Sequence, residues 1–188
     1  MNAEVDISNV ILTTDRLKIR FWQLSDLDDF YSYASVDGVG QMAGWQPHEN
    51  KEQSLDILRH FIDEKNSFAL EYYGKVIGSL GIEKYSEDKF PEFKDKRCRE
   101  IGYVLSKAYW GQGLMPEAVS KVIEYLFLET KLDVIFCRHS VCNLQSARVQ
   151  EKCGFRLYSY RKFETSIGTV ENKEVNILTR EEYVKYAE

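Results

Sequence analysis

The sequence has no long hydrophobic run and no excess of positive charge. Its longest uninterrupted apolar segments are Tyr125–Leu128 and Val134–Cys137, whereas a membrane-spanning helix needs about 20 apolar residues. Among its 188 residues, 25 Lys and Arg face 30 Asp and Glu, so the net charge is −5. Proteins that neutralise nucleic-acid phosphates need a basic surface. We therefore expect no membrane association and no direct binding to nucleic acid.

Cysteine and histidine are scarce, and their spacing fits neither paired disulfides nor a metal site. The four cysteines form no CxxC pair, and none of the three histidines lies at metal-ligand spacing from another candidate ligand. The segment Met1–Ser8 lacks the basic and apolar parts of a signal peptide. We expect no metal, a cytoplasmic location, and buried free thiols at Cys98, Cys137, Cys142 and Cys153.

The length and the hydrophobic periodicity predict a single α+β (mixed α/β) domain over residues 1–188. The length suits one domain at about 100–200 residues each, and 44% hydrophobic residues suit a globular core. Strands are expected over residues 10–21, 67–73, 75–85, 99–106, 133–141, 158–164 and 170–178. Helices are expected over residues 25–36, 51–65, 114–127 and 143–153 and from 179 on, which gives the order βααβββαβαββα.

Local patterns add detail to this assignment. The first strand is expected to bury Ile11, Leu17, Ile19 and Phe21, with Ser25 capping the helix after it. Residues 86–99 alternate charges of both signs, which favours a solvated hairpin loop over a partner-binding patch.

A glycine turn opens the helix that begins at residue 114. Gly111 and Gly113 let the backbone approach a ligand closely, and the N–H groups and positive dipole end of the helix follow at once. This combination predicts an anion site suited to a pyrophosphate, with an ordinary strand-to-helix turn as the alternative. No Gly-Lys-Ser/Thr follows, and Pro116 replaces the third glycine of a dinucleotide fingerprint.

A second cluster follows the next expected strand, with Asn143 and Ser146 at a helix start and Glu151-Lys152-Cys153-Gly154-Phe155 at its end. Together with Tyr109-Trp110-Gly111-Gln112-Gly113-Leu114, it resembles the GNAT superfamily of acyl-CoA-dependent N-acyltransferases. The closer resemblance is to the branch named for ribosomal-protein N-terminal acetyltransferases. Further matches are Thr13–Arg20, Trp45–His48, Ile77-Gly78 and Glu100–Leu105. The resemblance implies the GNAT fold, a central, mostly antiparallel twisted sheet flanked by helices.

The resemblance also implies how acetyl-CoA is held. The N–H groups of Gly111, Gln112, Gly113 and Leu114, with Met115 next along the helix, would bind the pyrophosphate. Val104 and Leu105 would pair through their backbone with the pantetheine arm, and one of their N–H groups would polarise the thioester carbonyl. Asn143 would reach the pantetheine as well as cap its helix. Trp110 would pack on the cofactor or, alternatively, in the core. A phosphate-binding side chain of the wider family is Ala108 here, so Arg148 and Lys152 are expected to help.

For the chemistry, the resemblance assigns two residues. Glu100 stands at the position of the base that takes a proton from the amine, directly or through water. The residues alone allow a solvent-facing carboxylate paired with Arg97 or Arg99. Gln150 occupies the position at which many GNAT enzymes have a tyrosine that acts as general acid. The branch instead has Ser146 to hydrogen-bond the leaving sulfur, with a helix-start serine bonded to the backbone as the alternative.

These features predict an N-acetyltransferase that moves an acetyl group from acetyl-CoA to a primary amine by direct attack in a ternary complex. The amine would be a protein N-terminus or a small amine such as a polyamine. The alternative is a non-catalytic acyl-CoA-binding sensor or regulatory module. By family analogy, the loop 38–50, the first two helices and the hairpin after Phe155 form the acceptor side, with Tyr31, Tyr33, Trp45 and His48 as candidate lining. A monomer or a homodimer fits the sequence.

Overall fold

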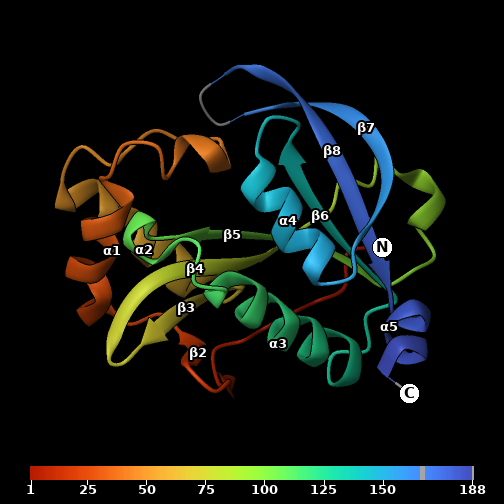
Figure 1. Cartoon of the computed structure of the whole chain (residues 1–188), viewed down its shortest axis with the longest axis horizontal. Helices are drawn as coiled ribbons and strands as arrows, with labels where there is room; N and C mark the ends of the chain where they lie inside the picture. Colours follow the sequence, from red (N-terminus) through yellow and green to blue (C-terminus); the bar gives the residue numbers. More distant parts are fainter. Residues whose placement is uncertain (166–167, 188) are drawn as a thin grey trace.

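The computed structural model describes residues 1–165 and 168–187, and it is built around one eight-stranded sheet in the order β1-β2-β3-β4-β5-β6-β8-β7 (Figure 1). Among the described strands, only β5 and β6 pair in parallel, and every other neighbouring pair is antiparallel. The elements are β1 (Ile11–Thr13), β2 (Leu17–Phe21), α1 (Leu27–Ala34), α2 (Lys51–Glu64), β3 (Ser67–Tyr72), β4 (Lys75–Glu83), β5 (Cys98–Leu105), α3 (Leu114–Leu128), β6 (Val134–Ser140), α4 (Leu144–Lys152), β7 (Arg156–Glu164), β8 (Val170–Thr179) and α5 (Arg180–Ala187). The α+β class and the mixed, mostly antiparallel sheet match the expected fold. Among the described residues, no helix is long and apolar enough to cross a membrane.

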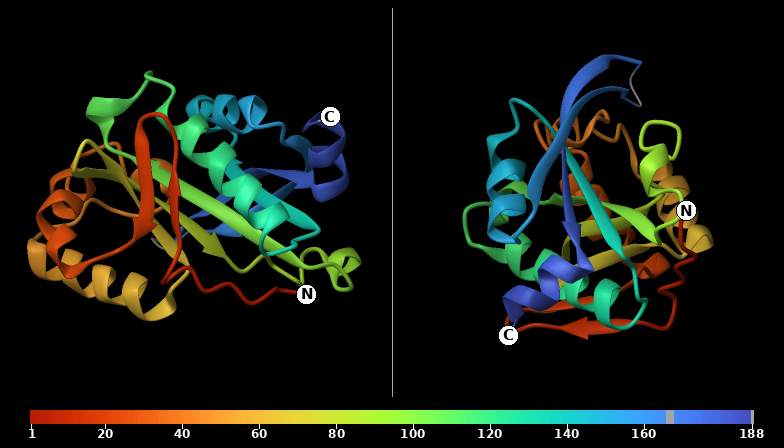
Figure 2. Two further views of the ribbon diagram at one scale, coloured as in Figure 1. Left: turned by 90° about the horizontal axis from the view of Figure 1, so that it is seen from below. Right: turned by 90° about the vertical axis from the view of Figure 1, so that its right-hand side faces the viewer.

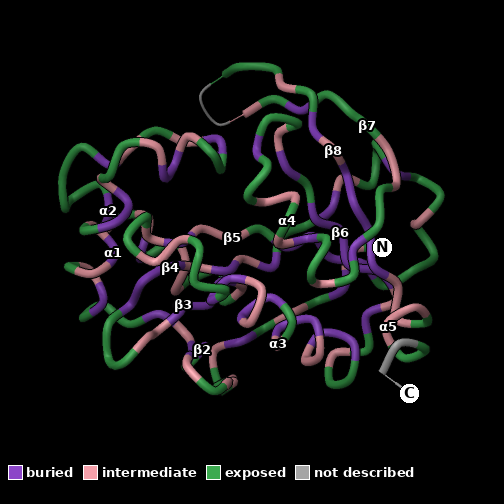
Figure 3. The backbone as a smooth tube through the Cα atoms, viewed as in Figure 1, coloured by how far each residue is buried: buried purple, intermediate pink, exposed green. Residues whose placement is uncertain are grey.

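The helices cover both faces of the sheet (Figure 2). The apolar stripe of α3 packs on one face against Phe68 and Leu70, while α1 and α2 cover the other face around Trp22 and Leu58. Successive strand residues point to opposite faces, so Ala69 belongs to the second core although its neighbours belong to the first. Burial is therefore concentrated in the central strands, as Figure 3 shows.

The parallel pair β5 and β6 parts midway along its length. The two strands pair only from Cys98 opposite Val134 to Ile101 opposite Cys137. Beyond that point β5 continues to pair with β4 as far as Leu105, whereas β6 pairs with β8 along its whole length. Within residues 1–165 and 168–187, one edge of the second half of β5 is therefore left without a neighbouring strand.

The expectation of a single strand over residues 10–21 was wrong. The segment forms the hairpin β1–β2, because the Thr14 hydroxyl accepts the Leu17 N–H at 2.9 Å and turns the chain. The order therefore begins with two strands. Ile11 is 63% exposed rather than buried, since it lies on the edge strand β1. Ser25 lies within a short 3₁₀ turn (Leu24–Asp26) rather than capping α1, and the Asp26 carboxylate accepts the Gln23 N–H there.

Several local predictions are confirmed. Asn143 caps α4, Gly154 ends it at φ +83°, and Thr179 with Glu182 forms a capping box for α5. The mixed-charge segment is mostly exposed as expected, although Phe90 anchors it to the core. The cysteines were predicted only in part. Cys98 and Cys137 are buried, but Cys153 is half-buried and Cys142 is exposed in the turn before α4.

Candidate active site

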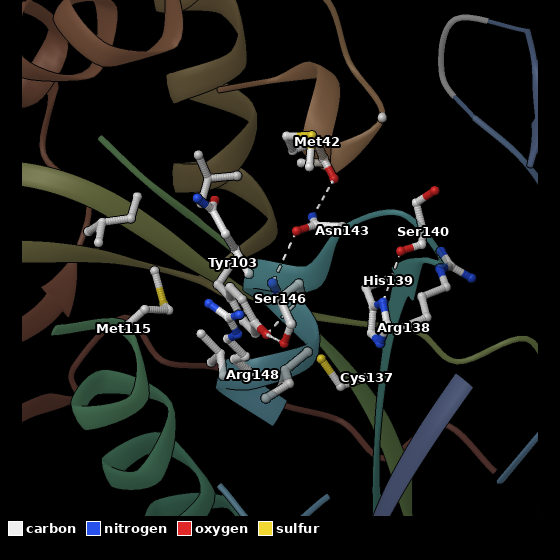
Figure 4. A pocket seen from close by; sticks show the side chains of 18 of the residues that line it. Met42, Tyr103, Met115, Cys137, Arg138, His139, Ser140, Asn143, Ser146 and Arg148 are labelled. Carbon is white, nitrogen blue, oxygen red and sulfur yellow. Dashed lines mark hydrogen bonds between the residues drawn. The ribbon is translucent and has the colours of Figure 1, made fainter. Parts of the chain in front are cut away.

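A cavity of about 750 Å³ lies where β5 and β6 part. Its walls come from the loop between α1 and α2, from β5 and β6, from the start of α3, from α4, and from β7 and β8. Figure 4 shows Ser146 and Arg148 of α4, with the N-cap Asn143, on one side of the cavity and Arg138 and His139 of β6 on another. The volume falls in the range of small-molecule sites, roughly 300–1,000 Å³.

The glycine turn forms one end of the cavity. Gly111 and Gly113 adopt φ values of +76° and +77°, a region that favours glycine. The Glu117 N–H makes the bond that opens α3, to the Gly113 carbonyl. In the described part of the chain, no acceptor is found for the N–H groups of residues 111–115. The turn therefore presents free N–H groups at a helix N-terminus, as an anion site requires.

The β1–β2 hairpin holds this turn in place. The Arg16 guanidinium donates to the Gln112 carbonyl at 2.9 Å and pairs with the Glu117 carboxylate at 2.6 Å. The Thr14 hydroxyl also donates to Glu117. Partial burial alone would raise the pKa of Glu117, but the hydrogen bonds from Thr14 and Arg16 lower it. Sequence reasoning placed Thr13–Arg20 only in a strand, and it missed this role. Gln112 does not line the cavity, because its carbonyl faces Arg16.

The open edge of β5 forms one wall. The Ser106 N–H donates to the Ile77 carbonyl at 2.7 Å, and antiparallel bonding alternates along the β4–β5 pair. The N–H of Val104 therefore points to β4, and those of Tyr103 and Leu105 point to the open edge. Of the two residues expected to pair with a pantetheine arm, Leu105 is the one whose N–H is available. Both line the cavity.

Trp110 links this wall to the glycine turn. Its indole Nε1–H donates to the Leu105 carbonyl at 2.8 Å, and its ring contacts the cores on both faces of the sheet. Trp110 also lines the cavity, so both roles suggested by the sequence are open to it.

Glu100 lies in the cavity wall at the point where β5 and β6 part. Its side chain is 9% exposed and pairs with Arg138 of β6 at 2.9 Å, whereas Arg97 and Arg99 bond to backbone carbonyls elsewhere. The alternative of a solvent-facing carboxylate paired with Arg97 or Arg99 is therefore wrong. The pKa of Glu100 is raised to about 7, mainly by burial and in part by the nearby Glu83 carboxylate, against the opposing effect of Arg138.

Two neighbours of Glu100 were not found from the sequence. Glu83 of β4 is directly opposite Glu100 in the strand register, so the two carboxylates share one face and one cavity. The Arg138 guanidinium stacks over the Phe163 ring of β7, 4.1 Å from its centroid. Strand register sets both contacts, and the sequence of one chain carries no local signal for them.

Ser146 faces the same cavity from α4 (Figure 4). Its N–H donates to the Asn143 side chain at 3.0 Å, and its Oγ lies 3.0 Å from the Tyr103 hydroxyl and 3.2 Å from Gln150 Nε2. The Asn143 Nδ2 also donates to the Met42 carbonyl at 3.2 Å, which ties α4 to the loop between α1 and α2. Sequence reasoning did not identify Tyr103 as a partner of Ser146.

The other expected residues divide into two groups. Leu114, Met115, Arg148, Lys152 and Trp45 line the cavity. Tyr31, Tyr33 and His48 do not. His48 bonds to the Ser54 hydroxyl at 2.7 Å and packs edge-on against Phe30, so it belongs to the α1–α2 core. Burial lowers the pKa of His48 and raises that of the Tyr33 hydroxyl.

The fold and this site define an acyltransferase-like protein, and comparison with known proteins gives the family. Residues 16–156 match the acetyltransferase (GNAT) domain family. The chain therefore belongs to the GNAT family and is an N-acetyltransferase of it. The uncharacterised N-acetyltransferase p20 of Bacillus licheniformis is 26% identical over 180 residues, which cover 92% of this chain and 97% of that protein.

Solved structures share the fold. A GNAT-family acetyltransferase from Bacillus anthracis superimposes with a TM-score of 0.79 at 22% identity, covering 92% of this chain and 99% of that one. The microcin C7 self-immunity acetyltransferase MccE, solved in complex with acetyl-CoA and AMP, gives a TM-score of 0.73 at 16% identity. That match covers 88% of this chain and 93% of the other.

Proposed function

We propose that this chain is a single catalytic domain over residues 1–188 that transfers an acetyl group from acetyl-CoA to a primary amine by direct attack in a ternary complex. The proposal includes no metal and a cytoplasmic location, and a monomer or a homodimer is compatible with it. Its cosubstrate is supported by the neighbouring MccE structure in complex with acetyl-CoA. It is also supported by the free N–H groups of the residues that line one end of the cavity, Gly111, Gly113, Leu114 and Met115.

The arrangement of β5 carries the proposal. Side chains alternate along a strand, so Glu100 lies on the face opposite Ile101 and Tyr103. Ser146 lies against Tyr103, and Glu100 therefore faces the cavity from the other side of the sheet. A thioester held along the open edge would then have a base on one side and a hydroxyl on the other. This arrangement lets the amine lose its proton on one side of the thioester while the departing sulfur receives a hydrogen bond on the other.

Each group then has a defined task. Glu100, directly or through one water, takes the proton that the attacking ammonium must lose. The amine nitrogen forms a bond to the thioester carbon, and the N–H of Leu105 at the open edge stabilises the resulting oxyanion. The C–S bond breaks as the carbonyl reforms, the nitrogen releases its second proton to solvent, and the Ser146 hydroxyl donates a hydrogen bond to the departing thiolate. Arg148 and Lys152 assist the glycine turn in holding the phosphates, and Trp110 packs beside the cofactor.

The acceptor is proposed to be a protein N-terminus or a small amine. Structures with the same fold include a ribosomal-protein-S5-alanine acetyltransferase from Vibrio fischeri, with a TM-score of 0.69, and a spermidine N-acetyltransferase SpeG chimera, with a TM-score of 0.72. The carboxylates of Glu83, Glu100 and Glu164 line the cavity. They favour a cationic acceptor, and Trp45 would contact it from the loop between α1 and α2.

The test measures thiol release from acetyl-CoA with a panel of amines, which includes peptides that start with Ala, Ser or Met, spermidine and aminoglycosides. We expect turnover with one class of amine and a fall of about 100-fold or more in Glu100→Gln. Glu52→Gln, an exposed carboxylate on α2, is the matched control and should leave the rate unchanged. Absence of acetyl-CoA binding by calorimetry would remove the basis of the proposal.

The second candidate is a non-catalytic acyl-CoA sensor. It is favoured by Gln150, which occupies the position of the tyrosine that acts as general acid in many GNAT enzymes. Under this alternative the protein binds CoA tightly but releases no thiol with any amine, and neither Glu100→Gln nor Ser146→Ala changes the result.

A further inference from the structure

The Ser146 hydroxyl ends a chain of buried amides that extends from β8 to the cavity. Asn176 Nδ2 donates to Gln150 Oε1 at 2.8 Å, and Gln150 Nε2 donates to Ser146 Oγ at 3.2 Å. Gln150 is 1% exposed and Asn176 is 5% exposed. Neither lines the cavity, whereas Ser146 does. Effects of these amides on a ligand in the cavity therefore pass through the hydroxyls that Gln150 contacts there, mainly Ser146 and in addition Tyr103.

The direction of this chain is fixed at its far end. Asn176 Nδ2 also donates to the Glu174 carboxylate, at 3.4 Å. The Asn176 amide therefore turns its NH₂ toward both Glu174 and Gln150. Gln150 must accept with its oxygen, and its NH₂ is left to face Ser146. The Ser146 oxygen consequently accepts from Gln150 and does not donate to it.

Tyr103 occupies a second side of the Ser146 hydroxyl. Its hydroxyl lies 3.0 Å from Ser146 Oγ, with the Ser146 carbonyl farther away at 3.3 Å. Burial raises the pKa of Tyr103, so this phenol stays neutral and able to donate. A serine hydroxyl has two acceptor sites and one proton. Gln150 donates to the serine oxygen, and either hydroxyl can donate across the 3.0 Å contact between Ser146 and Tyr103. When Tyr103 is the donor, the serine proton is left for a partner in the cavity.

We propose that Gln150, oriented by Asn176, and Tyr103 are positioning residues that direct the Ser146 proton into the cavity toward the sulfur of bound CoA. The inference rests on the proposed function, because that function places the sulfur there. Gln150 then supports the donor rather than acting as an acid itself. No proton needs to leave Tyr103, and the sulfur departs as a hydrogen-bonded thiolate.

The test titrates the thiol of bound CoA through the ultraviolet absorbance of its thiolate, with desulfo-CoA as the reference ligand. A hydrogen bond from Ser146 should hold the thiol pKa below its usual value of about 8.5. Ser146→Ala should raise the thiol pKa by about one unit. Gln150→Met and Tyr103→Phe, which keep size and remove a donor, should raise it by part of that amount.

The decisive comparison combines the substitutions. In a Ser146→Ala background, Gln150→Met should cause a much smaller further shift of the thiol pKa, because its main path to the sulfur passes through the serine. An equal shift in both backgrounds, or none in either, would overturn the inference. Thermal unfolding identifies any variant that does not fold, and Tyr103→Phe then provides the comparison in place of Gln150→Met.

Turnover provides a separate readout. Gln150→Met should lower kcat and leave the KM for acetyl-CoA nearly unchanged, whereas a general loss of structure would change both. The outcomes separate the two proposals. A protein that binds no CoA overturns the proposed function and this inference together. A protein that binds CoA, and whose thiol pKa is the same in all variants, overturns only the inference.

Discussion

The pH dependence of turnover should report the ionisation of Glu100. Burial raises the pKa of this carboxyl from its usual 4.5 to about 7, and only the ionised form can accept a proton from the amine. Activity should therefore rise with pH through about 7. At about pH 5, roughly 1% of such a group is ionised, so kcat/KM should be about 100-fold lower than at about pH 9 from this cause alone.

The neighbours of Glu100 allow its ionisation to be separated from that of the acceptor amine. Arg138 lowers the pKa of Glu100 and Glu83 raises it. Arg138→Gln should therefore move the lower limb of the profile to higher pH, and Glu83→Gln should move it to lower pH. An amine acceptor with a different pKa should leave this limb where it is, because the limb belongs to the enzyme.

The assay is thiol release across this pH range at saturating acetyl-CoA. In Glu100→Gln the remaining activity should be lower by about 10²–10⁴-fold and should lose this limb. Glu52→Gln should reproduce the profile of the unchanged protein. The reasoning is refuted if Glu100→Gln keeps the same limb, or if Arg138→Gln and Glu83→Gln shift it in the same direction.

Three further substitutions test the frame around the site. Gly113→Ala, at φ +77°, should raise the KM for acetyl-CoA about tenfold through about 1–2 kcal/mol of backbone strain, and an unchanged KM in steady-state kinetics would contradict this role. Asp26→Asn removes the bidentate partner of the buried Arg20 and leaves Glu71 as its remaining carboxylate. It should lower the free energy of unfolding in urea by about 2 kcal/mol, and a loss no larger than that of an exposed ion pair, under about 1 kcal/mol, would contradict this. Gly78→Ala would put a Cβ 2.4 Å from the Val104 carbonyl, so calorimetry should find a lower Tm and weaker CoA binding than in the unchanged protein.

Helices and turns could be predicted from the sequence because their signals are local. The α3 stripe, the Asn143 cap and the Gly154 terminator each depend on residues within a few positions of one another. The β1–β2 hairpin was missed because the turn Thr14–Arg16 is stabilised partly by Glu117, which is about a hundred residues away in the chain. The hydrophobic periodicity of residues 10–21 does not indicate that contact.

In the candidate site, too, the residues with local sequence signals could be predicted and those placed by long-range pairing could not. The motif residues could be placed on elements, and the structure brings Glu100, Ser146 and the glycine turn to one cavity. The residues that change the pKa of Glu100 could not be found from the sequence. Arg138 and Glu83 come close to Glu100 only because of the registers of β5–β6 and β4–β5. Asn176 reaches Ser146 only through Gln150. Pairing between distant segments decides these contacts, and a single sequence does not specify it.

The charge distribution resolves an apparent conflict in the overall composition. A protein with a net charge of −5 would repel a polyanion such as CoA if only the total charge mattered. The free N–H groups of residues 111–115 open α3, and Cys153 Sγ lies 3.5 Å from the Pro116 carbonyl in the first turn of that helix. The end of α4 that carries Lys152 therefore lies beside the glycine turn, so positive groups from two helices gather at one end of the cavity. Glu83 and Glu100, on adjacent strands, put negative charge on the opposite face of the sheet. Because charges separated by more than about 10 Å are screened in salt, these local groups outweigh the total, and the same acidic protein can hold an anionic donor and attract a cationic acceptor.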